Sequence, residues 1–167
     1  MTIQVFLRDV TVDDLPIFFA QQLDADANFM AAFTSRDPAD RDAFMAHWSR
    51  IMSDPTIVTK TILAESKIAG NIACFGASSE REVGYWLGKE FWGKSVATQA
   101  LAAFLAQATP RPLYAHVAKD NVASRRVLEK CGFVIIGEEK EFATARGHEI
   151  AAFVLKLSTH ATKEIAP

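Results

Sequence analysis

The sequence predicts a single α+β domain built around a mixed β-sheet. Read in chain order, its hydrophobic periodicities give one strand, two helices, three strands, a helix, a strand, a helix and two strands. This order is not the strict alternation of strand and helix that a parallel α/β fold requires. A length of 167 residues fits one domain. We therefore expect one folded unit over residues 1–157, followed by a polar C-terminal tail over 158–167.

The N-terminal half predicts a strand, two helices and a hairpin. The first helix begins with acidic residues, which the helix dipole favours, and must hold Pro16 within its first turn. The second is expected to begin at the Asp37–Asp40 segment, with Asp37 as a candidate N-cap beside Pro38. The hairpin turns at Ser66 and Lys67. The expected strands are 3–8, 56–65 and 67–75, and the expected helices are 12–24 and about 37–51.

The C-terminal half begins with the last of the three consecutive strands. It then predicts the clearest helix of the chain, a second helix and three further strands. The clearest helix opens near Ser95, carries an apolar stripe and ends before Pro110. The second helix has Asn121 as its N-cap, and Gly132 with Phe133 matches the glycine-based Schellman ending. The expected strands are 83–87, 113–117, 134–140 and 149–157, and the second helix is 121–130.

Composition and charge exclude several functional classes. A net charge of -2 gives no basic excess with which to neutralise nucleic-acid phosphates. No apolar run approaches the roughly 18 residues that a membrane span requires, and no signal peptide is visible. We therefore expect a cytoplasmic protein that binds neither nucleic acid nor membrane. Cys74 and Cys131 are expected to be reduced, and the scattered histidines predict no metal site.

The segment WLGKEFWGKSVATQ at 86–99 carries the strongest chemical signal. A strand ends here, a loop containing Gly88 and Gly93 turns, and a helix opens near Ser95. Unpaired N–H groups at a helix start, together with the helix dipole, make a site for phosphate. The alternative is that Gly93 only makes a tight turn and Ser95 is an ordinary N-cap. The segment matches neither the dinucleotide G-x-G-x-x-G pattern nor the P-loop.

Two segments resemble hallmarks of the GCN5-related N-acetyltransferase (GNAT) superfamily. WLGKEFWGKSVATQAL is similar to its pyrophosphate-binding loop and helix, and NVASRRVLEKCGF is similar to its Asn-x-x-Ser helix ending in Gly-Phe. The resemblance is specific over 83–133 and favours the branch of ribosomal-protein N-terminal acetyltransferases (RimJ/RimL-like). It implies a mostly antiparallel sheet of about seven strands with about four flanking helices.

The resemblance also implies acetyl-CoA, or another acyl-CoA, as co-substrate and no metal. The strand at 83–87 would offer backbone groups to pantetheine, and the following loop would hold the pyrophosphate. The residues expected to bind the cofactor are Trp86, Leu87, Gly88, Trp92, Gly93, Lys94, Ser95, Val96, Ala97, Thr98, Asn121 and Ser124.

Three positions depart from the superfamily pattern. Glu90 places an acid near the expected pyrophosphate, and Ser95, at a position that is Gly or Ala in the pattern, adds a side chain where the ligand should pass. Leu128 stands where many members carry the tyrosine that protonates the leaving thiolate. These departures keep a second interpretation open, in which the chain is a catalytically silent CoA-binding or sensor module. A third is a structural or interaction domain that keeps only the fold.

The candidate catalytic residues are His116, Ser124 and Glu82. His116 lies five residues before Asn121, where related N-terminal acetyltransferases carry a catalytic Glu, and an imidazole suits a base at neutral pH. Glu82, at the foot of the strand 83–87, is the second candidate base. Ser124 resembles the residue proposed to protonate the thiolate in this branch. The alternatives are a packing histidine, a solvated strand-end acid and a helix-start hydroxyl.

The implied reaction is direct attack of a primary amine on the thioester in a ternary complex. The acceptor is a small molecule or a protein N-terminus, and the sequence does not choose between them. Asp24 and Asp26 could attract a cationic amine, although loop acids are commonly just solvated. A homodimer is also left open.

Overall fold

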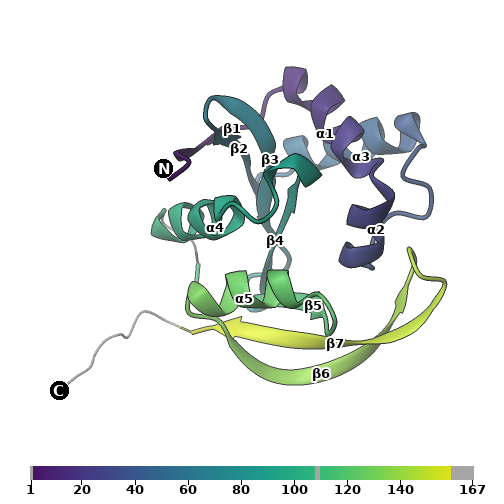
Figure 1. Cartoon of the computed structure of the whole chain (residues 1–167), viewed down its shortest axis with the longest axis vertical. Helices are drawn as coiled ribbons and strands as arrows, with labels where there is room; N and C mark the ends of the chain where they lie inside the picture. The colour runs from purple at the N-terminus through teal and green to yellow at the C-terminus, as the bar shows by residue number, and fades with distance from the viewer. Residues whose placement is uncertain (1, 108–109, 159–167) are drawn as a thin grey trace.

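The structure is a computed structural model that describes residues 2–107 and 110–158. These residues form seven strands, five α-helices and two short 3-10 helices (Figure 1). The strands are β1 Val5–Asp9, β2 Val58–Ala64, β3 Lys67–Phe75, β4 Arg81–Leu87, β5 Leu113–Ala118, β6 Val134–Ala143 and β7 His148–Leu157. The helices are η1 Val12–Asp14, α1 Leu15–Gln22, α2 Ala25–Ala31, α3 Arg41–Ser53, η2 Lys89–Phe91, α4 Val96–Ala106 and α5 Val122–Lys130.

The seven strands make one sheet in the order β1-β2-β3-β4-β5-β7-β6. Every neighbouring pair is antiparallel except β4 and β5, which are parallel and are connected through α4. The pairing of β4 with β5 comprises only Arg81 with Leu113 and Glu82 with Tyr114. Beyond these two pairs the strands separate, so the sheet is open at its centre.

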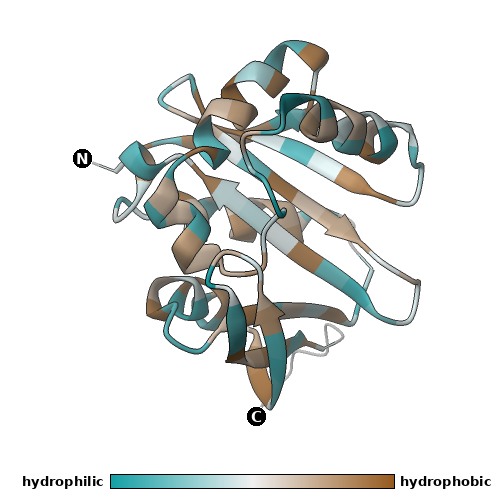
Figure 2. Cartoon of the chain, turned by 90° about the vertical axis from the view of Figure 1, so that its right-hand side faces the viewer, coloured by the Kyte–Doolittle hydropathy of each residue, from teal (hydrophilic) through white to brown (hydrophobic). Residues whose placement is uncertain are grey.

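Two layers of helices cover the sheet. Figure 1 shows α4 and α5 on one side of the strands and α1, α2 and α3 on the other. The main core lies under α4 and α5, where Leu101, Phe104 and Leu128 pack with inward residues of β2 to β5. A smaller cluster beneath α1 and α3 is aromatic, with Phe18, Phe44, Trp48 and Leu15 buried together. Hydrophilic and hydrophobic residues are mixed along the strands and helices, as the colouring of Figure 2 shows.

Local signals explain most element ends. Glu65 and Ser66 both have positive φ, as the tight turn between β2 and β3 requires. Asn121 caps α5 by accepting a hydrogen bond from Ser124 N–H at 3.3 Å. At the other end of α5, Phe133 N–H donates to Leu128 C=O at 3.1 Å, and Gly132, with φ of 99°, donates to Glu129 C=O. This is the predicted Schellman ending.

The predicted α+β fold is confirmed, with corrections to particular elements. The helix expected over 12–24 is a 3-10 turn followed by α1, with Pro16 in the first turn of α1 as required. The chain then forms α2, which the sequence analysis missed, so there is one α-helix more than expected. Its N-cap is Asp24, whose side chain accepts from Ala27 N–H. Asp40, not Asp37, caps α3, since its side chain accepts from Ala43 N–H at 2.9 Å.

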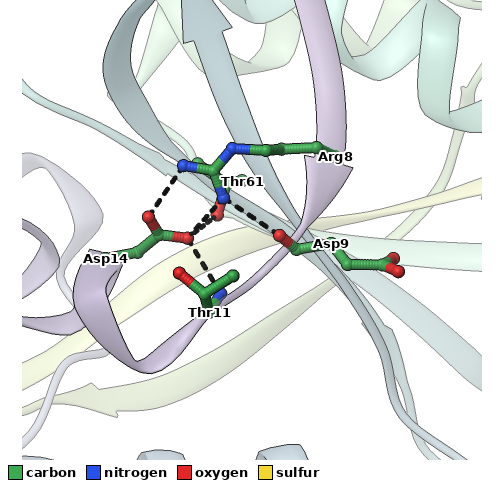
Figure 3. A network of polar contacts seen from close by, with 5 residues as sticks. All are labelled: Arg8, Asp9, Thr11, Asp14 and Thr61. Carbon is green, nitrogen blue, oxygen red and sulfur yellow. Dashed lines mark hydrogen bonds and ion pairs between the residues drawn. The ribbon is translucent and has the colours of Figure 1, made fainter.

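A buried carboxylate anchors the start of α1 to the sheet (Figure 3). Asp14 is 2% exposed and accepts two hydrogen bonds from the Arg8 guanidinium, each 2.8 Å long. It also accepts from Thr61 Oγ1 at 2.6 Å and from Thr11 N–H at 3.0 Å. Burial alone would raise the pKa of Asp14, but these donors prevail and lower it from 3.8 to about 2. The network joins β1, β2 and the helical layer on this side.

Cys74 and Cys131 are both free, as expected. Among the helices of residues 2–107 and 110–158, none has the length and apolar character needed to cross a bilayer. The predicted polar tail, apart from Ser158, lies outside the described residues.

Candidate active site

The central feature of the candidate site is the opening between β4 and β5. A pocket lies there, lined by residues of both strands and of α5, including Gly84, Tyr85, His116 and Ser124. Gly88 N–H donates to Ala69 C=O at 2.8 Å on the β3 side. Because successive strand residues direct their backbone groups to alternate sides, those of Tyr85 and Leu87 are directed toward the opening. The Leu87 carbonyl accepts from the Trp92 indole Nε1–H at 3.2 Å.

The two faces of the sheet present different chemistry to this opening. Val83 and Leu87 of β4, with Ala115 and Val117 of β5, are buried in the core under α4 and α5. Side chains alternate along a strand, so Glu82 and His116 project to the opposite face, which α1 to α3 cover. The pocket also reaches Ala31 at the end of α2. One opening therefore connects a face with α4 and α5 to a face with an imidazole and a carboxylate.

The two candidate bases form one unit. Glu82 Oε1 lies 2.8 Å from His116 Nδ1, although the residues are 34 positions apart in sequence. A carboxylate can only accept, so this bond places a proton on Nδ1 and leaves Nε2 as the basic nitrogen of a neutral imidazole. His116 and Glu82 have side chains that are 26% and 36% exposed, so substrate and water can reach both. This geometry resembles the base-and-orienting-carboxylate arrangement of nucleophilic enzymes.

Two further acids, which the sequence analysis missed, lie near the basic nitrogen. His116 Nε2 is 3.5 Å from Glu139 Oε2, and one ligand atom from each of His116, Glu139 and Glu141 falls within 4.8 Å of the others. Both acids lie on β6, which is separated from β5 by β7. A strand order with β7 between β5 and β6 is not visible in local sequence patterns.

Ser124 lies on the opposite face of the sheet from His116, and its hydroxyl contacts a second hydroxyl. Its Oγ is 2.8 Å from the phenol oxygen of Tyr85, a residue that the sequence analysis did not single out. Burial raises the pKa of Tyr85 to about 12, although the hydrogen bond with Ser124 opposes this increase. Asn121, besides capping α5, donates from Nδ2 to the Met30 carbonyl at 3.2 Å. Asn121 therefore joins the start of α5 to the end of α2.

The loop before α4 has the backbone geometry of an anion cradle. The first hydrogen bond of α4 is donated by Gln99 N–H to Ser95 C=O. The amides that precede Gln99 in the first turn therefore have no acceptor within the helix. Gly93 has a φ of 71°, and a Cβ added there would meet nothing within 4 Å. Ser95 has a φ of 64° and makes no side-chain capping bond. Ser95 is therefore not an ordinary N-cap, because it occupies a left-handed conformation that favours glycine.

The remaining residues expected to bind cofactor follow the chain from β4 into α4. Glu90 is exposed on η2, and the neighbouring Lys89 pairs with Asp26 at the start of α2. This pair gives Asp26 a structural role next to the loop. Leu87, Gly88 and Val96 are buried, Trp86, Ala97 and Thr98 are half-buried, and Trp92 and Lys94 are exposed. The structure thus brings the loop, the opening and the two hydroxyls together along one side of the molecule.

The sheet is thus open between two parallel central strands, with a helix start at one side of the opening. Comparison with known proteins gives the family. The family model for the acetyltransferase (GNAT) domain matches residues 4–134, and the chain belongs to this family. The predicted resemblance to the GNAT superfamily is therefore confirmed, as is the assignment to acyltransferases.

Individual relatives share only about a quarter of their residues with this chain, or fewer. The chain is 26% identical over 136 residues to YdaF of Bacillus subtilis (strain 168), a protein named provisionally as a ribosomal N-acetyltransferase. That match covers 76% of this chain and 74% of YdaF. The structure of Mycobacterium smegmatis RimJ, in complex with CoA-disulfide, has a TM-score of 0.80 at 21% identity. It covers 98% of this chain and 87% of RimJ.

A second structure has the same fold with a different named substrate. Spermidine N-acetyltransferase from Vibrio cholerae, in complex with CoA and spermine, has a TM-score of 0.78 at 17% identity. The match covers 93% of this chain and 95% of that protein. At these identities the two solved structures support the fold alone.

Proposed function

We propose that the chain transfers an acetyl, or another short acyl group, from acyl-CoA to a primary amine by direct attack. The observation that carries this proposal is the opening between β4 and β5, with Ser124 on one face of the sheet and the Glu82–His116 pair on the other. Such an opening lets a thioester enter from one face and an amine from the other. The proposed partners have the same chemistry as the ligands of the two solved neighbours, which hold CoA-disulfide and CoA with spermine.

On the cofactor side, the Gly93 loop would bind the pyrophosphate. The unpaired amides at the start of α4 and the positive end of its dipole favour an anion there. The open edge of β4 would hydrogen-bond the pantetheine arm as an added strand would. Tyr85 N–H, directed into the opening, would contact the thioester carbonyl. Donors that face a developing oxyanion stabilise the transition state.

On the acceptor side, His116 would act as the general base. An amine enters mostly as ammonium and must lose a proton before it attacks the thioester carbon. Nε2 of His116, with Glu139 Oε2 at 3.5 Å, is the basic nitrogen in this proposal, while Glu82 holds the ring through Nδ1. The attacking nitrogen forms the new C–N bond, the C–S bond then breaks, and the sulfur takes the electron pair and a proton. Ser124, on the cofactor side, is the proposed donor of that proton.

The test of this function is thiol release from acetyl-CoA across a panel of amines. The panel should include peptides with free N-termini, polyamines and amino acids, and it also identifies the acceptor class. Turnover with at least one amine is expected. Binding of acetyl-CoA without turnover on any amine would favour the silent CoA-binding module, and absence of both would favour a domain that keeps only the fold.

The base assignment predicts a specific pattern among variants. His116→Ala should lower turnover by about 10²–10⁴ while acetyl-CoA affinity stays near that of the unmodified protein. The loss should shrink at alkaline pH, where more of the amine is neutral unaided. Glu82→Gln should also lower turnover, because the amide can donate to Nδ1 and no longer fixes the tautomer in which Nε2 is the base. His148→Ala is the control, since His148 is exposed and bonds only to a neighbouring carbonyl.

An unchanged pH profile in His116→Ala would contradict its role as base. In that case Glu82, or a water that Glu82 holds, becomes the candidate.

A further inference from the structure

The hydroxyl pair formed by Tyr85 and Ser124 has no role in the proton abstraction by His116. Both residues line the pocket between β4 and β5, and their hydroxyl oxygens are 2.8 Å apart. Tyr85 follows Val83 by two positions on β4, so its side chain projects to the face covered by α4 and α5. The pair therefore lies on the side of the opening assigned to the cofactor, across the sheet from His116.

The pair fills a gap that Leu128 leaves. Leu128 is 2% exposed and packs in the core, so no proton donor comes from this position of α5. Ser124 is one turn earlier on the same helix, and Tyr85 approaches it from the strand. The phenol thus reaches the cofactor side from β4 instead of from α5.

We propose that Tyr85 is a positioning residue that donates its phenolic hydrogen bond to Ser124 Oγ and so directs the Ser124 proton toward the departing CoA sulfur. This inference rests on the proposed acyl transfer. When the C–S bond breaks, the sulfur takes the electron pair and the Ser124 proton. Ser124 later recovers a proton from water, the first of the two protons that the ammonium loses leaves through His116 and the second leaves to solvent, and Tyr85 keeps its own proton throughout.

Two properties of the phenol favour Tyr85 as the donor in this hydrogen bond. A phenol is a stronger acid than an alkyl hydroxyl, so it is the better donor of the two. Burial raises the pKa of Tyr85 to about 12, which keeps the phenol protonated at every pH at which the protein would work. The phenol O–H is also within hydrogen-bonding distance of the Ser124 carbonyl, but this contact is longer, at 3.4 Å against 2.8 Å to Oγ. With its lone pair occupied by Tyr85, Ser124 has its own proton free to face the pocket.

The first experiment is a double-mutant cycle on turnover. Tyr85→Phe keeps the ring in place and should lower kcat by about 10- to 100-fold, with KM for acetyl-CoA within about twofold of the unmodified protein. Ser124→Ala should lower kcat by at least as much. If Tyr85 acts through Ser124, the double variant should be no slower than Ser124→Ala alone. Independent losses that multiply in the double variant, or unchanged kcat in Tyr85→Phe, would overturn the proposal.

A second readout does not depend on turnover. The chain has two tyrosines, so a Tyr114→Phe protein labelled with 3-fluorotyrosine gives one fluorine NMR signal, from Tyr85. Tyr114→Phe also retains the ring against which Lys156 lies. CoA should shift this signal more than desulfo-CoA does, and Ser124→Ala should remove the difference. Equal shifts from the two ligands would contradict a link between Tyr85 and the sulfur.

The two readouts separate the failure of this inference from failure of the proposed function. If the protein acetylates amines and Tyr85→Phe leaves kcat unchanged, the proposed function stands and the inference about Tyr85 fails. A protein that acetylates nothing, yet shows the sulfur-dependent fluorine shift abolished by Ser124→Ala, keeps the Tyr85–Ser124–sulfur contact and loses the function.

Discussion

At the scale of single residues, Asp14 is the clearest case of a buried charge whose surroundings determine its protonation. Its carboxylate accepts four hydrogen bonds, from Arg8, Thr61 and Thr11, within the layer that carries α1 (Figure 3). The pKa of Asp14 is about 2 in the folded chain, against 3.8 as its ordinary value. Because the folded-state pKa is the lower one, Asp14 stabilises the fold above pH 3.8, and this contribution is lost as pH falls toward 2.

Asp14→Asn should therefore destabilise the protein by about 2 kcal/mol or more at neutral pH, because Arg8 and Thr61 lose their charged partner. The difference in free energy of unfolding between the two proteins should shrink between pH 4 and pH 2. Denaturant titrations across this range measure it. Asp9→Asn is the control: Asp9 pairs with Lys60 but its side chain is 86% exposed, so its replacement should have little effect. Equal costs for the two variants would contradict the role given to Asp14.

At the scale of elements, local sequence signals predicted most of the fold. The cap and Schellman ending of α5, the hairpin turn and Pro16 in α1 depend on residues a few positions apart, so a single sequence carries them. The helix α2 was missed because it has only seven residues, between its N-cap Asp24 and Ala32, which has a φ of 67°.

The candidate site was less predictable because its contacts cross the sheet. His116 and Glu82 were predicted separately as alternatives, and only the parallel pairing of β4 with β5 brings them together. Glu139 reaches His116 from β6, two strands away. Tyr85 could have been noticed as a polar residue on the expected pantetheine strand, but its partner Ser124 is 39 positions further on.

The loop before α4 allows the cost of a side chain at a positive-φ glycine to be separated from its effect on acetyl-CoA binding. Gly93 has a φ of 71° and Gly147, in the β6–β7 turn, has a φ of 74°, and an added Cβ meets nothing within 4 Å at either. Gly93→Ala and Gly147→Ala should therefore destabilise the ligand-free protein by a similar amount, about 1 kcal/mol. Only Gly93→Ala should weaken acetyl-CoA binding, because its Cβ enters the proposed pyrophosphate site. Calorimetric affinities and denaturant midpoints separate the two effects. Normal acetyl-CoA affinity in Gly93→Ala would place the phosphates elsewhere.

At the scale of the whole molecule, the opening divides the sheet into two parts. The β1–β4 part and the β5–β7 part share only two residue pairs of strand contact, and the α4 and α5 helices pack across the division. The β6–β7 hairpin arches along one side of the molecule, as Figure 1 shows. A ligand between β4 and β5 would contact both parts, so its binding energy would oppose their separation.

Acetyl-CoA should therefore raise the unfolding temperature of the whole domain in a single transition. At a ligand concentration 100 times Kd, the stabilisation is about 2.7 kcal/mol, which for a chain of this size corresponds to a shift of about 5–10 °C. EDTA should leave the shift intact, since the proposed cradle is made of backbone amides and a helix dipole. Adenosine 3′,5′-bisphosphate, which lacks the pantetheine arm, should give a smaller shift. Hydrogen exchange should show new protection along β4 and β5 with acetyl-CoA but not with the bisphosphate. If millimolar acetyl-CoA leaves both the transition and the exchange of these strands unchanged, the opening is not the thioester site.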